Sequence, residues 1–235
     1  MTRWFHLLAL TIGLLLPIGV LCQNDFELWT GTDLRYKVSK ELNCGLKLES
    51  RFKSNITEVD QTFLSPYLQY KPSDHIRLGL DYRMANRPSS GFLGKQFTHR
   101  ITMDLIFRDL TKDINALKRF NFDTRIRFTH ATRNEGELNN NNLRFRIKVD
   151  YNLRKTKLTP HFAASIFYHF NDQIIYTKNE VQTLHRFNKY RLRIGANYPI
   201  HKKHVVGLFY MIQPEINGSK TTYVLSLGYS YRIKK

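Results

Sequence analysis

The strongest constraint on the fold is a period-two alternation of apolar and polar residues that recurs along the chain. Its clearest example is Leu143 to Leu153, LRFRIKVDYNL, in which every second residue is apolar and the residues between are charged or polar. Side chains alternate between the two faces of a strand, so this stretch has one apolar and one polar face. In a soluble sandwich the apolar face covers the core, whereas in an outer-membrane barrel it faces lipid and the polar face lines the interior.

The same alternation predicts eleven strands, and these are Phe26–Val38, Leu42–Lys53, Gln61–Lys71, His75–Arg83, Phe97–Phe107, Phe120–His130, Leu143–Leu153, Leu158–Phe170, Tyr190–Tyr198, His204–Ile212 and Thr221–Ile233. The third is the least regular, because Phe63 and Tyr67 fall on the face opposite Leu64. Pro66 weakens it further, since proline cannot donate a ladder hydrogen bond. Bacterial single-chain barrels have even strand numbers, so we expect 10 to 12 strands. The segment from Asn171 to Lys189 is interpreted as a tall hairpin or as the place of a further strand.

Two other features favour a membrane barrel over a soluble sandwich. Short connections, such as Pro72 to Asp74 and Pro199 to Lys203, alternate with longer ones, which is typical of outer-membrane barrels. The link from Asp109 to Arg119 breaks this order and is predicted to hold a brief helix. Outside the third strand, the central parts of the apolar faces carry no Lys, Arg, Asp or Glu. Lipid would penalise such a residue by about 2 to 4 kcal/mol.

The strand ends carry two further membrane signals. Aromatic residues cluster there, as the interfacial girdles of a barrel require. In the last strand, the spacing of Ser226, Gly228, Tyr231 and Ile233 resembles the signal read by the bacterial barrel-insertion machinery, although an ordinary alternating strand is an equal alternative. The sequence therefore predicts an all-β fold, a single antiparallel up-and-down transmembrane β-barrel of 10–12 strands.

The first 22 residues are interpreted as a cleaved signal peptide. Arg3 gives a positive start, and Leu7 to Val20 form an apolar run that is short for a membrane-spanning helix. Cys22 ends a plausible cleavage site. Lipidation of Cys22 is an alternative, although Leu21 is larger than the residue that lipoprotein signals place there. We therefore expect one β-barrel domain, residues 23–235, exported to the bacterial cell outer membrane.

The chain is strongly basic, with 37 Lys and Arg against 19 Asp and Glu and a formal net charge of +18. Many of the cations fall on the polar strand faces. Long side chains would fill a barrel of this size with a plug of salt bridges, and this is the interpretation that we favour. The alternative is an anion-preferring channel or binding barrel, since arginine forks match carboxylate and phosphate. The candidate lumen-facing basic cluster comprises Arg125, Arg127, Arg144, Arg146, Lys148, Arg191 and Arg193.

Other function classes fit less well. His161, Ser165 and His169 share one strand face, as a lipid hydrolase would require, but that face points inward and has no acidic partner, so no catalytic residue is assigned. No Cys and His spacing suits a metal, and no cofactor is expected. Export argues against nucleic acid as a ligand. The expected partners are membrane lipid and lipopolysaccharide, with the barrel-insertion machinery during assembly, and the oligomeric state is left open.

Several short motifs, taken in order, resemble an uncharacterised outer-membrane β-barrel family of Bacteroidota, a domain-of-unknown-function family. The motifs are Asp25-Phe26 with Leu28-Trp29-Thr30, Asp60-Gln61, Leu78-Gly79-Leu80-Asp81-Tyr82-Arg83, the run from Arg144 to Tyr151, Asn188-Lys189-Tyr190-Arg191 and the run from Thr221 to Leu225. The resemblance spans nearly all of the mature chain. It implies a barrel in the outer membrane and brings no catalytic residues with it.

Overall fold

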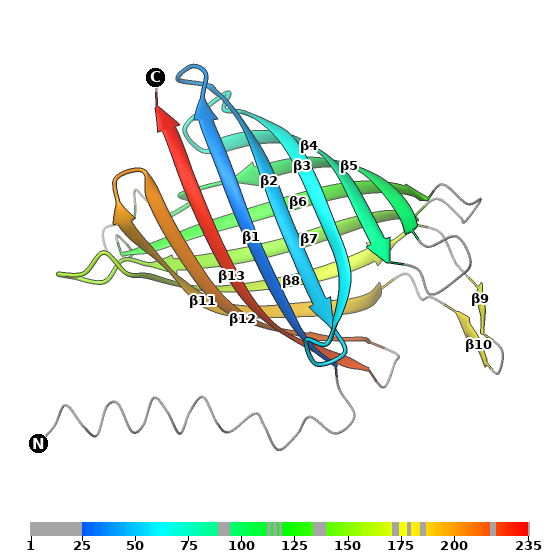
Figure 1. Cartoon of the computed structure of the whole chain (residues 1–235). Coiled ribbons are helices and arrows are strands. Elements are labelled where there is room, and N and C mark those ends of the chain that lie inside the picture. Colours follow the sequence, from blue (N-terminus) through cyan, green and yellow to red (C-terminus); the bar gives the residue numbers. More distant parts are fainter. Residues whose placement is uncertain are drawn as a thin grey trace, which may run out of the picture.

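In the computed structural model the chain forms a closed β-barrel (Figure 1). The structure describes residues 25–88, 95–111, 114, 117, 119–133, 140–170, 174–177, 180–183, 187–216 and 220–234. Eleven of the described strands form the barrel, and two others form a separate hairpin. The strands are β1 (Asp25–Lys37), β2 (Leu42–Lys53), β3 (Glu58–Tyr70), β4 (Ile76–Pro88), β5 (Lys95–Phe107), β6 (Phe120–Arg133), β7 (Asn140–Tyr151), β8 (Thr159–His169), β9 (Ile174–Thr177), β10 (Glu180–Thr183), β11 (Phe187–His201), β12 (His204–Pro214) and β13 (Thr221–Lys234).

The barrel closes by a parallel pairing of its first and last strands. β1 pairs with β13 from Asp25 opposite Thr222 to Lys37 opposite Lys234, whereas the other neighbouring strands of the barrel are antiparallel. An odd number of up-and-down strands leaves the first and the last running in the same direction. The all-β barrel and the range of 10 to 12 strands are confirmed. The expectation of an even strand number is wrong, and the predicted antiparallel pairing holds between all neighbouring strands of the described barrel except β1 and β13.

The barrel has a polar interior and an apolar exterior. On β8, the buried residues His161, Ala163 and Ser165 alternate with Phe162, Ala164 and Ile166. Phe162 and Ile166 are exposed, and Ala164 is partly exposed. Alternation on the other strands leaves a belt of exposed apolar side chains around the outside, which includes Leu48, Leu80, Met103, Ile147, Ile194 and Leu208. The two faces predicted from the period-two pattern are therefore confirmed.

The irregular third strand is a full member of the barrel. β3 turns Phe63 and Tyr67 inward, and Phe63 is only 1% exposed. The register between β3 and β4 omits Ser65 and Pro66, as expected where proline offers no N–H group. β3 begins at Glu58, so four residues separate it from β2. The predicted alternation of short and long connections is therefore incomplete.

Two of the longer connections contain short local structure. In the link after β5, the N–H of Ile114 donates to the carbonyl of Thr111, and the N–H of Leu117 donates to that of Ile114. This three-residue spacing is that of 3₁₀ turns, so the described part of the link holds turns where a brief helix was predicted. Between β8 and β11, β9 and β10 pair with each other in a separate two-stranded sheet. They do not extend β8 and β11 into one tall hairpin, and the described residues of this segment add no barrel strand.

Within the described residues, no helix is long and apolar enough to cross a membrane. The predicted signal peptide, residues 1–22 with Cys22, lies outside the described residues.

Candidate functional site

The seven basic residues predicted to face the lumen lie on three strands of the barrel, namely Arg125 and Arg127 on β6, Arg144, Arg146 and Lys148 on β7, and Arg191 and Arg193 on β11. The residues of β6 and β7 share a strand face with the buried residues Asp123, Thr129 and Asp150. Arg191 and Arg193 lie opposite the buried residues Ser165 and Ala163 of β8. The structure therefore places all seven on the inner wall. We refer to the six arginines of this set as the arginine cluster.

β8 separates β7 from β11 and carries small inner side chains at the level of the cluster. Ser165 lies opposite Arg146 on one side and opposite Arg191 on the other. Ala163 lies in the same way between Lys148 and Arg193. Small residues beside large ones let long side chains from two strands reach over a third. The sequence of β8 thus leaves room for guanidinium groups from both neighbours.

One carboxylate holds part of the arginine cluster together. Asp104 on β5 accepts two hydrogen bonds from Arg127, each 2.7 Å long, and lies 3.8 Å from Arg125. The Asp104 side chain is only 9% exposed. Two parallel bonds between a guanidinium and a carboxylate form one of the strongest polar pairs in proteins. Within the described residues, Arg144 and Arg146 have no carboxylate within ion-pair distance, so Asp104 is the main counter-charge of the cluster.

Arginine nitrogens without partners extend well beyond the arginine cluster. Among the described residues, seven inward-facing arginines have a buried Nε that makes no hydrogen bond, namely Arg77, Arg83, Arg100, Arg125, Arg144, Arg146 and Arg193. A buried donor left unpaired costs about 1 to 3 kcal/mol. Within the described residues, the ion pairs of the inner wall therefore leave these seven Nε donors without an acceptor.

The inner carboxylates do not make up this deficit. Lys148 uses Asp150, with Nζ 2.6 Å from the carboxylate, so Lys148 is largely neutralised. Asp81 accepts a hydrogen bond from Ser65, and Glu27 accepts one from the indole of Trp29. Both of these donors are uncharged. Within the described residues, neither Asp81 nor Glu27 forms an ion pair with an arginine or a lysine.

Aromatic rings inside the barrel support several of the arginines. The guanidinium carbon of Arg51 lies 3.6 Å from the ring centre of Trp29, and that of Arg83 lies 3.6 Å from Phe63. Phe167 on β8 lies 5.1 Å from the guanidinium of Arg191. Such cation–π contacts hold an arginine without neutralising its charge. The sequence-based prediction did not include these rings in the site, although Trp29 shares a strand face with the charged residues Glu27 and Asp33.

Glycines thin the inner wall on three neighbouring strands. Gly31 lies opposite Gly228, which lies opposite Gly207, on β1, β13 and β12. A Cβ at Gly228 would find no non-neighbouring atom closer than 4.0 Å, so there is free space beside it. A pocket of about 210 Å³ lies along this wall, and its charged lining residues are Asp33, Lys47 and Glu49. We refer to Gly31, Gly207 and Gly228 as the glycine wall. It supplies free space beside Gly228.

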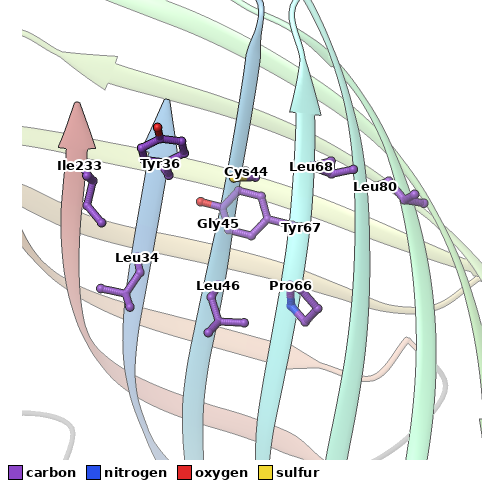
Figure 2. Close-up of a pocket in the computed structure, with 10 residues that line it drawn as sticks. All are labelled: Leu34, Tyr36, Cys44, Gly45, Leu46, Pro66, Tyr67, Leu68, Leu80 and Ile233. Atoms are coloured by element: carbon purple, nitrogen blue, oxygen red, sulfur yellow. The ribbon is translucent and has the colours of Figure 1, made fainter. Parts of the chain in front are cut away.

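A larger hollow, of about 450 Å³, lies in the exterior and is almost wholly apolar (Figure 2). Its lining comes from β13, β1, β2, β3 and β4 and includes Leu34, Tyr36, Cys44, Leu46, Pro66, Leu68, Leu80 and Ile233. Behind it, Tyr67 packs against Gly45 and donates a hydrogen bond of 2.8 Å to Asp33. The lining brings no set of charged groups together, so this hollow belongs to the exposed apolar belt.

The residues of the hydrolase alternative are all on β8 but do not form a catalytic pair. Ser165 is four residues from both His161 and His169, a separation of about 13 Å along a strand. A serine nucleophile needs a base within hydrogen-bonding reach, about 2.6 to 3.2 Å. Within the described residues, Ser165 makes no side-chain hydrogen bond with either histidine, and no group of three or more His, Cys, Asp or Glu residues is placed to hold a metal ion.

Comparison with known proteins identifies the family of this chain. A crystal structure titled "NanC porin structure in rhombohedral crystal form" is similar to this chain with a TM-score of 0.41 and 13% sequence identity, over 79% of this chain and 86% of that chain. No curated protein matches significantly. Residues 26–224 match the family described as "Protein of unknown function (DUF2490)". The assignment to Bacteroidota stays a prediction. Because the family match spans most of its length, this chain belongs to DUF2490, a family of proteins of unknown function.

Proposed function

We propose that this chain is a bacterial outer-membrane β-barrel whose basic lumen binds and passes small anions. The exterior supports the membrane setting. Ile194 and Ile147 lie near the middle of their strands and are 62% and 57% exposed, and their apolar neighbours continue this surface around the barrel. Soluble monomers rarely expose so extended an apolar surface. Closure of the sheet also removes the unpaired edges that lipid does not tolerate.

The observation that carries the anion preference is the set of seven buried arginine Nε atoms without a partner. Donors of this kind need acceptors, and among the described residues the carboxylates are too few. We infer that water and anions in the lumen would supply the missing acceptors when these side chains turn toward it. Chloride, carboxylate or phosphate would be attracted by the same guanidinium groups that repel cations. The lumen is therefore expected to select for negative charge.

The glycine wall supports an open passage through the barrel rather than a closed plug. Gly31, Gly207 and Gly228 place no side chain of their own on this side of the lumen, and a Cβ at Gly228 would meet open space. A plug is the second candidate, and it is favoured by the ion pairs of Arg35 with Asp33 and of Arg51 with Glu49. These pairs narrow the lumen from the neighbouring strands. The two candidates differ in whether ions cross the barrel.

The test is ion flux into vesicles that contain the refolded chain, with a large side chain inserted into the lumen. In Gly228→Trp the Cβ meets open space, so the barrel should form and the indole should occupy the lumen. Leu227→Trp is the matched control, because Leu227 is the next residue on the strand and is exposed on the outer face. Heat-modifiable migration checks folding of each variant.

Wild type and Leu227→Trp should admit chloride much faster than potassium, and Gly228→Trp should reduce chloride entry to near background. Vesicles that stay impermeable to chloride with wild-type protein would establish the closed plug and overturn the passage. Equal entry of potassium and chloride would overturn the anion preference.

The proposed partners follow from this setting. The apolar belt would contact membrane lipid and lipopolysaccharide. The end of β13, with Ser226, Gly228, Tyr231 and Ile233, supports recognition by the barrel-insertion machinery during assembly. No observation favours lipid hydrolysis.

A further inference from the structure

The inner wall around Ala163 brings hydrogen-bond donors and acceptors together. Ala163 lies opposite Lys148 of β7 and Arg193 of β11. The next inward residue on β8 is His161, which lies opposite Asp150. Arg146 is the next inward residue beyond Lys148 on β7. Because Ala163 has only a methyl group, the longer side chains around it can converge above it. We refer to Arg146, Lys148, Asp150, His161 and Arg193 as the β8 station.

Three members of the β8 station have buried polar atoms without partners. Among the described residues, the Nε atoms of Arg146 and Arg193 find no hydrogen-bond partner, and neither does either ring nitrogen of His161. His161 is only 5% exposed. The ring of Phe209 lies 4.5 Å from the guanidinium of Arg193 and holds it from one side. The station is therefore a built site whose polar atoms lack a ligand of matching hydrogen-bond pattern.

The unpaired atoms include acceptors as well as donors. A neutral imidazole has one N–H donor and one acceptor nitrogen. The neutral form avoids adding a positive charge beside Lys148 and Arg193. Asp150 is a second acceptor, because a carboxylate can accept more bonds than the one it receives from Lys148. A ligand that satisfies the station must accept hydrogen bonds from the arginines and also donate one hydrogen bond to His161 or Asp150.

We propose that the β8 station binds inorganic phosphate in its monohydrogen form. The two arginines would donate to its unprotonated oxygens, and its single P–OH group would donate to the acceptor nitrogen of His161. Sulfate has nearly the same size and shape but carries no proton at neutral pH. It would leave this acceptor unpaired and would face the Asp150 carboxylate without an intervening proton. The site should therefore distinguish phosphate from sulfate. This inference rests on the proposed function only in that the ligand reaches the site through the lumen.

The test is isothermal titration calorimetry of the refolded full chain in an uncharged detergent, at neutral pH and constant ionic strength, with phosphate and sulfate as the two ligands. Wild type should bind phosphate roughly tenfold more tightly than sulfate, the ratio that one charge-assisted hydrogen bond supplies. His161→Phe should reduce phosphate affinity to that for sulfate and leave sulfate binding unchanged. Arg193→Leu should weaken both.

His169→Phe is the matched control, because His169 is an inward-facing histidine of the same strand, about 26 Å along it from His161. It should leave both affinities unchanged. Equal affinity of wild type for the two anions, no binding of either, or a phosphate preference that survives in His161→Phe would overturn the inference. Chloride flux in vesicles is measured on the same preparations. Flux without phosphate preference refutes the β8 station alone, and phosphate preference without flux refutes the passage alone.

Discussion

Replacing Asp104 by Asn should destabilise the barrel far more than the same change on its surface. The substitution keeps the shape of the side chain and removes the charge that faces two arginines. Arg127 would lose one of its two 2.7 Å bonds, since the new amide NH₂ group is a donor facing a donor. Arg125, 3.8 Å away, would lose its counter-charge. Among the residues that the structure describes, Asp104 is the carboxylate within ion-pair distance of Arg125 and Arg127, so no second carboxylate would replace its charge.

The magnitude follows from the burial of the pair. Removing one partner of a buried ion pair costs about 3 to 5 kcal/mol, whereas an exposed pair is worth about 0 to 1 kcal/mol. The Asp104 and Arg127 side chains are 9% and 18% exposed, which is close to the buried limit. Water in the lumen solvates part of the freed charge. We therefore expect a loss of about 2 to 4 kcal/mol in the free energy of unfolding.

The assay is equilibrium unfolding in urea of the chain refolded into lipid vesicles, where the free-energy change is read from the shift of the midpoint at a constant slope. Asp74→Asn is the matched control. Asp74 forms an ion pair with Lys71 in the turn between β3 and β4, but its side chain is 76% exposed, so its loss should cost less than about 1 kcal/mol. A loss for Asp104→Asn no larger than for Asp74→Asn would refute the role of Asp104 as the counter-charge of the arginine cluster.

Two further substitutions test the wall of the barrel by the same unfolding assay. Gly45→Ala should cost about 1 to 3 kcal/mol, because its Cβ would clash with the Tyr67 ring and lie 2.6 Å from the Leu34 carbonyl oxygen. The control Gly228→Ala places its Cβ in open space and should be nearly neutral. Equal losses for the two variants would contradict the packing of Tyr67 over Gly45. Ile194→Arg, near the middle of β11, should cost about 2 to 4 kcal/mol, and Ile200→Arg, near its end, about 0 to 1 kcal/mol. Absence of this dependence on depth would argue against a lipid-facing exterior.

The strands and their two faces could be predicted from the sequence because alternation is a local property. Whether Phe145 and Arg146 point to opposite sides depends only on their being neighbours in an extended chain. The parity of the barrel is not local. It depends on the pairing of β1 with β13, whose residues are about 200 positions apart. The rule of even strand numbers in bacterial outer-membrane barrels predicted the wrong outcome.

Phe63 shows a second limit. The alternation put its apolar side chain on the face opposite Leu64 without indicating what covers it, and it lies inside, where the guanidinium of Arg83 stacks on its ring. An inward aromatic residue is stabilised by arginines from other strands, so its direction depends on partners that the local pattern does not contain. For the same reason, the positions of the arginine cluster could be predicted from alternation, whereas its pairing with Asp104 depends on the register between β5 and β6.

The central claim, that unpaired arginines make the lumen selective for anions, is tested most directly by the reversal potential of the refolded chain in a planar bilayer under a potassium chloride gradient. The structure predicts a reversal potential with the sign of the chloride equilibrium potential, displaced toward zero when Arg144 and Arg146 are both replaced by Gln. A reversal potential with the sign of the potassium equilibrium potential, or a bilayer that stays silent with wild-type protein, would contradict the claim.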